Sequence, residues 1–344
     1  MKYIFGFFFL AVQWSGAMAQ KLEIGIVDYY GLSAPGAPAK SQVEACLAFK
    51  TGDQLDPESK NIWKDPTIAC LKKLPGIKQV KLEGVCCDEQ NRVMIFVGVL
   101  PHPAPAEAHR SFTLDERLPV ELVAAYDTLL GGMMIAIQTG QADEDDTKGH
   151  ALFRFPKAIE PQRLFAAYAS THLATLREVL HHSRHDKDRE VASWVIAFAE
   201  DKQGIVRDFV EAASDPSEDV RNNAIRALGI LDNYFRQAKV DVSIDPTPFV
   251  EMMNSITWSD LNKSANLLVS LTSDRNPGLM AKLRKEALYP LADMARWKST
   301  GHAYPAFMIL GRMAGWPDEV TYQRANADRM KWIDAALLEI ERKK

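Results

Sequence analysis

The chain has 344 residues, of which 47% are hydrophobic and 25% are charged, with 41 Lys and Arg against 45 Asp and Glu. These ordinary globular values exclude collagen, wholesale disorder and a polytopic membrane protein. The formal net charge of −4 leaves no basic surplus for a phosphate backbone, so we expect no nucleic-acid partner. The length permits one large core or several smaller ones, and we expect two.

The first residues, 1–19, have the pattern of a secretory signal peptide. Lys2 precedes a short apolar run, and Ala17-Met18-Ala19 offers small residues where a signal peptidase cleaves. The run is shorter than the roughly 20 apolar residues of a spanning helix, although an uncleaved anchor is the alternative. Cleavage would leave a mature chain that begins at Gln20, in which we expect no transmembrane segment. The sequence therefore predicts export, into the bacterial periplasm.

All cysteines lie in one short N-terminal stretch, at Cys46, Cys70, Cys86 and Cys87. An exported protein folds where disulfides persist, so we expect at least one disulfide among these candidates. A bond between the adjacent Cys86 and Cys87 needs a distorted peptide, which favours pairing across to Cys46 or Cys70. No Cys-x-x-Cys zinc spacing occurs. A catalytic thiol is the minor alternative, because no neighbouring basic cluster is present to activate one.

Residues 20–100 predict a small α+β unit. Apolar side chains alternate, or nearly so, in three segments bounded by turn residues. We expect strands over 22–27, 80–83 and 93–99.

Two helices are expected between the first and second of these strands. Val43, Cys46 and Leu47 share one face of the first helix, which Thr51-Gly52-Asp53 ends. Asp65-Pro66 has the pattern of an N-cap and first helical residue, so we expect the second helix to begin there. The order of elements is β-α-α-β-β.

That order resembles the polypeptide-transport-associated (POTRA) domain of bacterial envelope proteins. The resemblance is carried by Phe49-Lys50-Thr51-Gly52-Asp53-Gln54-Leu55 and by Leu71-Lys72-Lys73-Leu74-Pro75-Gly76-Ile77, and it covers residues 20–100 only. The cysteines depart from the usual pattern. The resemblance implies a domain that offers an exposed sheet edge to a partner strand. An unrelated small α+β domain is the alternative.

Beyond residue 100 the pattern becomes helical almost to the C-terminus. Residues 101–117 form a Pro-rich linker, and residues 118–160 a helical connector. Leu122, Tyr126 and Leu129 make one apolar stripe at helical spacing. His172 falls on another such stripe, so we expect it to lie in the core.

Two polar clusters could bind a metal ion. The segment 143–146 is acidic, but Lys148 stands where an EF-hand loop needs glycine, so we expect a solvated loop between helices. His181 and His185 have a spacing that can hold a metal on one helical face, yet His185 falls in a polar turn. No hydrolase, phosphate-binding or dinucleotide motif occurs. We therefore assign no catalytic residue, metal site or cofactor.

An internal repeat is the most informative signal. Val220, Ala224 and Leu228 share one apolar face of a predicted helix. The pattern recurs 32 residues earlier, and then at two further steps of 41 residues. The repeat-core residues that we assign are Ala192, Ala224, Ala265, Ala306, Val220, Leu228 and Leu310. Such spacings are typical of two-helix repeats, in which small residues let successive helices stack closely.

The segment Asp219-Val220-Arg221-x-x-Ala224-x-x-Ala227-Leu228-Gly229 resembles the HEAT-like repeats associated with phycobilin lyases and many adaptors. The match is degenerate in the other repeats. It implies an α-solenoid over residues 161–344, with a helical bundle as the alternative. It also implies helices that face a partner near 203–213, 247–255, 278–297 and 328–341. Arg207 and Glu211 are candidate partner contacts on the first of these.

The predicted fold class is thus an α+β N-terminal unit followed by an all-α solenoid of HEAT-like helix pairs. The sequence favours a non-enzymatic exported scaffold or adaptor that binds a protein partner in the cell envelope. One alternative is an enzyme or metal-binding protein with an unrecognised site, which a bound metal would favour. The other is a lyase-like chaperone that grips a cofactor or client, which a co-purifying ligand would favour.

Overall fold

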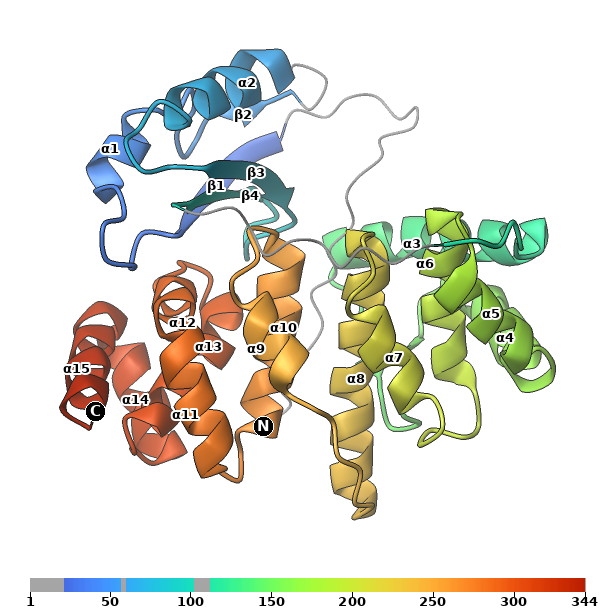
Figure 1. Cartoon of the computed structure of the whole chain (residues 1–344). Coiled ribbons are helices and arrows are strands. Elements are labelled where there is room, and N and C mark those ends of the chain that lie inside the picture. The colour runs from blue at the N-terminus through green and yellow to red at the C-terminus, as the bar shows by residue number, and fades with distance from the viewer. Residues whose placement is uncertain (1–21, 57–59, 102–111, 344) are drawn as a thin grey trace. The chain divides into compact units, whose positions relative to one another are not determined.

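The computed structural model describes residues 22–56, 60–101 and 112–343 (Figure 1). The predicted signal peptide and much of the predicted linker lie outside these residues. The described chain forms two compact units, of which one consists of residues 112–248 and the other joins residues 22–101 to residues 249–343. The predicted domain boundaries stay predictions. The structure adds that the sheet and the last helices of the chain belong to one unit.

The N-terminal region contains a four-stranded sheet with the order β2-β1-β4-β3. Its strands are β1 (Leu22–Tyr30), β2 (Gln54–Leu55), β3 (Gln79–Val85) and β4 (Val93–Leu100). β4 runs parallel to β1 and antiparallel to β3. The strands predicted over 22–27, 80–83 and 93–99 correspond to β1, β3 and β4. β2 was not predicted, since two residues are too few to show alternation.

β4 is buried along its whole length because both faces of the sheet are covered. Ile95 and Val97 belong to the core beneath α1 (Lys40–Glu44) and α2 (Lys60–Leu71), which lie on one face in Figure 1. On the other face, Phe96 packs edge-on against Trp297, with ring centroids 5.8 Å apart. A strand covered on both faces is apolar throughout rather than alternating.

Both short helices differ from their predicted bounds. α1 ends at Glu44, so Cys46 lies in the turn that follows it. α2 begins at Lys60, and Pro66 lies inside it, so the cap predicted at Asp65-Pro66 is wrong. Trp63 packs edge-on against Phe49, with ring centroids 5.7 Å apart. Tertiary packing of this side chain holds the turn before the proline helical, against local preference.

The cysteines form two disulfides. Cys46 and Cys70 join the turn after α1 to α2, with Cα atoms 5.3 Å apart; Cys46 belongs to the core and Cys70 packs against it. Cys86 and Cys87 are bonded to each other, so the preference for pairing them across the unit was wrong. Their peptide bond is cis, and their Cα atoms lie 3.1 Å apart.

The unit of residues 112–248 is mostly helical. Its helices are α3 (Val120–Gln138), α4 (Pro156–Thr171), α5 (Leu173–His182), α6 (Asp186–Val195), the short 3-10 helix Ile196–Phe198, α7 (Val206–Ala212) and α8 (Glu218–Ala238). The acidic segment 143–146 is not simply a solvated loop. Its Glu144 and Asp145 form β5, which pairs with β6 (Leu152–Phe153), and Glu144 makes an ion pair with Arg226. Each strand of this hairpin has only two residues, which is too short for a periodic pattern to reveal it in the sequence.

His172 is exposed, so its predicted place in the core is wrong. The predicted helical stripe breaks at this residue, which stands between α4 and α5. Its ring stacks on Tyr168 at 4.4 Å and contacts the Thr171 hydroxyl at 2.6 Å.

Within the described residues, α3 is long and apolar enough to cross a membrane by length and composition. We had expected no such segment after residue 20. α3 packs against α4 and α6, and its Leu122, Tyr126 and Leu129 are buried, while 33% of the apolar window as a whole is buried.

The other unit continues from α9 (Thr247–Met252), within which the boundary between the units falls. Its further helices are α10 (Trp258–Leu271), α11 (Pro277–Glu286), α12 (Leu288–Ala295), α13 (Thr300–Met313), α14 (Asp318–Ala327) and α15 (Arg329–Arg342).

The assigned repeat-core residues are all fully buried: Ala192, Val220, Ala224, Leu228, Ala265, Ala306 and Leu310. They lie on α6, α8, α10 and α13. In one unit α6 packs against α8, and in the other α10 packs against α13. Their equivalence as repeat positions stays a prediction.

Replacing Ala224 with Leu is expected to lower the free energy of unfolding by about 1–3 kcal/mol, because Ala224 is fully buried on α8 where extra methyl groups overpack the core. Arg207→Ala is the control, since the Arg207 side chain is 89% exposed and its loss should cost under about 0.5 kcal/mol. Urea denaturation measures both. Equal stabilities of the two variants would contradict close packing at Ala224.

Candidate functional site

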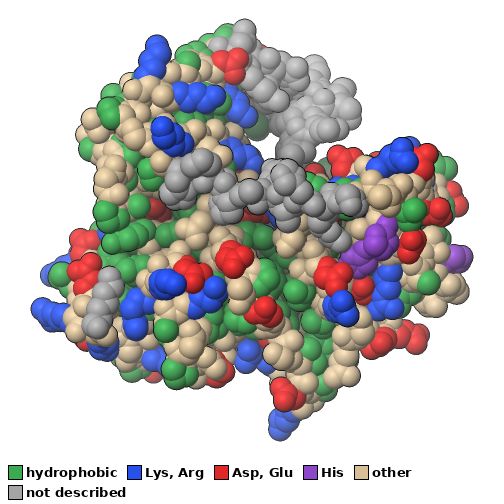
Figure 2. All heavy atoms as spheres, in the orientation of Figure 1, with side chains coloured by type: hydrophobic (Ala, Val, Ile, Leu, Met, Phe, Trp, Pro, Cys, Tyr) green, Lys and Arg blue, Asp and Glu red, His purple; other side chains and the backbone are tan. Residues whose placement is uncertain are grey.

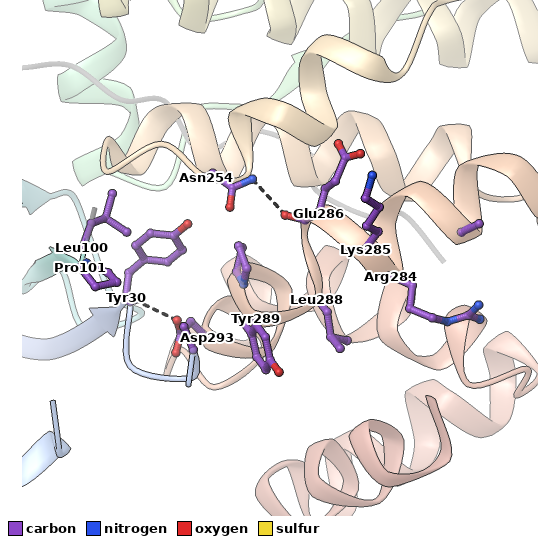
Figure 3. Close-up of a pocket in the computed structure, with 14 residues that line it drawn as sticks. Tyr30, Leu100, Pro101, Asn254, Arg284, Lys285, Glu286, Leu288, Tyr289 and Asp293 are labelled. Atoms are coloured by element: carbon purple, nitrogen blue, oxygen red, sulfur yellow. Dashed lines mark hydrogen bonds between the residues drawn. The ribbon is translucent and has the colours of Figure 1, made fainter. Parts of the chain in front are cut away.

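A cleft of about 520 Å³ opens within the unit of residues 22–101 and 249–343 (Figure 3). Tyr30 at the end of β1 and Leu100 and Pro101 at the end of β4 form one end of its lining. Arg284 and Lys285 in the last turn of α11 lie toward the other end, with the start of α12 between (Figure 3). The cleft thus lies where the strand ends meet the α11–α12 pair.

The wall of the cleft is held by Asp293, a buried residue of α12. Its Oδ2 accepts hydrogen bonds from the backbone amides of Gly31 and Leu32, at 2.9 and 3.1 Å. Its Oδ1 accepts from the Ser33 hydroxyl at 2.7 Å. One carboxylate therefore satisfies three donors of the segment that follows β1. Loss of any buried donor's partner costs about 1–3 kcal/mol, so this segment is tightly fixed to the helix.

Further bonds fix the end of β1 to the residues that follow α9 and α12. The Trp297 indole donates to the Tyr29 carbonyl at 2.9 Å, and the Lys298 amide donates to the Asp28 carboxylate at 2.8 Å. The Tyr30 hydroxyl donates to the Met253 carbonyl at 2.5 Å. These bonds join residues more than 200 positions apart in the sequence. The end of β1, which lines the cleft through Tyr30, is consequently held in place by these bonds.

The last turn of α11 carries the cationic side chains because the helix is well defined at both ends. The Asn276 side chain caps its N-terminus by accepting from the Leu279 amide at 3.1 Å, and Pro277 follows. Arg284 and Lys285 then fall in the last turn, where cations interact favourably with the helix dipole. Because α11 ends at Glu286, Arg284 and Lys285 lie in its last turn, beside the cleft.

The lining contains two cationic residues, Arg284 and Lys285, and two carboxylates, Glu286 and Asp293. Asp293 is occupied by its three donors, and Glu286 makes an ion pair with Lys282 at 2.8 Å. Among the ion pairs of the described residues, none joins Arg284 or Lys285 to a carboxylate. The Nε of Arg284 is buried without a hydrogen-bond partner, and its Nη2 donates to the Met313 carbonyl at 3.5 Å. Lys285 is exposed, so its ammonium group can interact with a molecule in the cleft.

Burial raises the pKa of Asp293 from 3.8 to about 6, against the opposing effect of its hydrogen bonds and of Arg296. Because this pKa lies above the unfolded value, the folded state binds more protons between about pH 4 and pH 6. The carboxyl therefore favours folding increasingly as pH falls through that window. Burial lowers the pKa of His302 from 6.5 to about 4, which acts in the opposite direction.

Asp293→Asn isolates the first of these effects, because His302 is common to both proteins. The free energy of unfolding of the wild type minus that of the variant should increase as pH falls from about 6 to 4. Urea denaturation across this range measures the difference. A difference that stays constant or falls would contradict the elevated pKa of Asp293.

The residues singled out from the sequence lie elsewhere. Arg207 and Glu211 are on α7, where they pair with each other at 2.7 Å. The cysteines belong to the sheet region but do not line the cleft. Asp293, Arg284 and Lys285 lie within the segment 278–297 that sequence analysis assigns to a partner-facing surface, but sequence reasoning did not single out any of them.

The two histidines considered for a metal site, His181 and His185, bond to different aspartates. His181 on α5 lies 3.1 Å from Asp208, which also binds Arg177 at 2.8 Å. His185, ahead of α6, contacts Asp115 at 2.8 Å. Histidines gather over α5 and α6 on the face in Figure 2, where acidic and basic side chains are interspersed. Across residues 22–56, 60–101 and 112–343 no three candidate ligands come together as a metal site.

No family model matches the sequence, and no curated protein matches it. Among solved structures, the chain is similar in part to a designed armadillo repeat protein in complex with the peptide (KR)4. The similarity covers 64% of this chain and 99% of the designed protein, with 16% sequence identity and a TM-score of 0.35. So low a TM-score supports no conclusion about this chain.

Proposed function

We propose that the protein is a non-enzymatic scaffold that binds a segment of a protein partner. The observation that carries the proposal is the cleft, which has an apolar end at the strands and a cationic end on α11. Its volume lies within the range of about 300–1,000 Å³ that is usual for binding sites. Binding sites combine such apolar walls with a few polar groups that fix orientation.

The chemistry of the lining favours binding over catalysis. The lining contains no serine, cysteine or histidine, and its two carboxylates, Glu286 and Asp293, are held by other groups. A nucleophile next to a free general base is the minimum for covalent catalysis. The cleft offers instead fixed walls and the exposed side chain of Lys285.

The repeat resemblance supports the same location. Two of the four segments that it assigns to a partner-facing surface, 247–255 and 278–297, contribute residues to the cleft. We propose that the helices form a HEAT-like solenoid and that the sheet region is a POTRA-like unit. In this arrangement the sheet closes one end of a groove on the helical surface.

We further propose that the protein is exported to the bacterial periplasm and that its partner resides in the cell envelope. The pattern of residues 1–19 supports this location. Expressed with its own start, the protein should be recovered outside the cytoplasm with Gln20 as N-terminus. N-terminal sequencing measures this, and recovery in the cytoplasm with Met1 retained would refute export.

Site-specific photo-cross-linking tests the scaffold proposal. A photoreactive amino acid at Ala281, an exposed cleft residue, should link the full chain to a discrete partner in an envelope fraction. The same group at Arg207 on α7 is the matched comparison, because it lies in the other unit. Cross-linking at Arg207 alone would move the binding surface to α7. Its absence at both positions would contradict a protein-binding scaffold.

A further inference from the structure

We infer that the Cys86–Cys87 disulfide is a reversible thiol–disulfide exchange site, which accepts electrons from a dithiol while the fold stays intact. The inference goes beyond the proposed scaffold function and is independent of it, because neither cysteine lines the cleft. It follows from how little the bond contributes to the fold, from the access of a reductant to its sulfurs, and from the place of the second disulfide in the core.

The two disulfides differ in the length of chain that they enclose. Cys46 and Cys70 are 24 positions apart, and their bond joins the turn after α1 to α2. Cys86 and Cys87 are neighbours, so their bond encloses no further residue. A disulfide restricts the unfolded chain more strongly as the loop that it closes becomes longer. We therefore expect the bond between the neighbours to contribute much less to folding than the bond between Cys46 and Cys70.

Other groups hold the turn in which the adjacent cysteines stand, between β3 and β4. Asp88 Oδ1 accepts hydrogen bonds from the backbone amides of Gln90 and Arg92, both at 2.9 Å. Asp88 Oδ2 accepts from Arg92 Nε at 2.9 Å, and the Asp88 amide donates to the Arg92 carbonyl at 2.9 Å. None of these bonds involves a cysteine, so opening the disulfide breaks none of them. The turn can therefore keep its form in the reduced protein.

A reductant reaches the adjacent cysteines more easily than the other pair. Cys86 and Cys87 are both half-buried and precede the exposed Glu89, and neither belongs to the core of the sheet region. Cys46, by contrast, is 8% exposed within that core, and Cys70 packs against it. A thiolate that attacked Cys70 would release the Cys46 thiolate into apolar surroundings, where burial disfavours the charged form. Exchange at the turn avoids this cost.

The exchange is a two-electron reaction. One thiolate of the dithiol attacks a sulfur of the pair, the bond between the cysteine sulfurs breaks, and its electron pair leaves on the other cysteine, which takes up a proton. The second thiolate of the reductant then attacks the mixed disulfide and releases the first cysteine as a thiol. The cysteine pair thus gains two electrons and two protons, and the dithiol becomes a disulfide. An oxidised dithiol runs the same steps in reverse.

Reduction of the folded full chain with graded dithiothreitol tests the inference. After each step, N-ethylmaleimide blocks the free thiols, and mass spectrometry identifies the alkylated peptides. The tryptic peptide 82–92, which contains Cys86 and Cys87, should be alkylated twice at a dithiothreitol concentration about 10-fold lower than Cys46 and Cys70 require. Circular dichroism should stay native at that concentration. Exchange into oxidised dithiothreitol should restore the bond.

The matched variants are Cys86→Ser/Cys87→Ser and Cys46→Ser/Cys70→Ser. The first should lose the early alkylation and melt close to the wild type, whereas the second should melt at a clearly lower temperature. Alkylation of Cys46 and Cys70 at an equal or lower dithiothreitol concentration would overturn the inference. So would a peptide 82–92 that resists reduction until the protein unfolds, or a greater loss of melting temperature for Cys86→Ser/Cys87→Ser than for the other variant.

Discussion

Replacing Arg189 with Met is expected to lower the free energy of unfolding of the unit of residues 112–248 by about 3–5 kcal/mol. Arg189 is 3% exposed and binds Asp215 through two bonds, Nε to Oδ2 at 2.9 Å and Nη2 to Oδ1 at 3.0 Å. It also donates to the Ser183 carbonyl at 2.9 Å, and its guanidinium lies 3.8 Å from the centre of the Phe112 ring. Methionine preserves the length of the side chain but leaves the Asp215 carboxylate buried and unpaired.

The double variant Arg189→Met/Asp215→Asn separates the buried charge from the loss of packing. Asparagine keeps an oxygen that can accept from the Ser217 amide, which Asp215 Oδ1 does at 2.8 Å. Removing the orphaned charge should recover part of the lost stability. Urea denaturation followed by tryptophan fluorescence, with Trp194 of α6 as reporter, measures all variants. A loss under about 1 kcal/mol for Arg189→Met would contradict the buried pair.

Replacing Gly31 with Ala is expected to destabilise the unit that contains the cleft by about 3–5 kcal/mol. Gly31 has a φ of 90°, a conformation that side chains disfavour. A Cβ at this position would lie 1.6 Å from the Val99 carbonyl oxygen, which belongs to β4 and cannot move away freely. The shift would also displace the Gly31 amide from Asp293 and open the wall of the cleft.

Gly36→Ala is the matched control for this prediction. Gly36 has a similar φ of 79°, but an added Cβ would meet no atom within 4 Å. The control should therefore cost only the backbone strain, about 1 kcal/mol. Thermal denaturation of the two variants separates strain from steric clash. Equal destabilisation would show that the close approach of Gly31 to Val99 does not constrain the segment after β1.

Local patterns in the sequence predict the elements better than they predict the contacts. The alternation of residues 93–99 and the small residues around Ala224 are local, and the structure places β4 and α8 there. Pro66 shows the limit of such signals, because the packing of Trp63 overrides its preference for a helix start. The bond between Cys86 and Cys87 has no counterpart in the local sequence pattern, which gives no preference for one cysteine pairing over another.

The cleft could not be found from the sequence, because its parts come together only through long-range contacts. Asp293 and Gly31 are 262 residues apart, and nothing local to either residue indicates the other. A single aspartate within the predicted partner-facing segment 278–297 is a weak signal by itself. The basic residues Arg284 and Lys285 look like an ordinary solvated helix end until the strand ends are placed beside them.

Hydrogen exchange of the full chain, with and without the partner captured by cross-linking at Ala281, tests binding in the cleft most directly. Binding there should slow exchange in the segments 30–34 and 281–291, which line the cleft, and leave α7 unchanged. Such a result would place the partner between the strand ends and the α11–α12 pair. Slowed exchange confined to α7, or no change in either cleft segment at a saturating partner concentration, would contradict it.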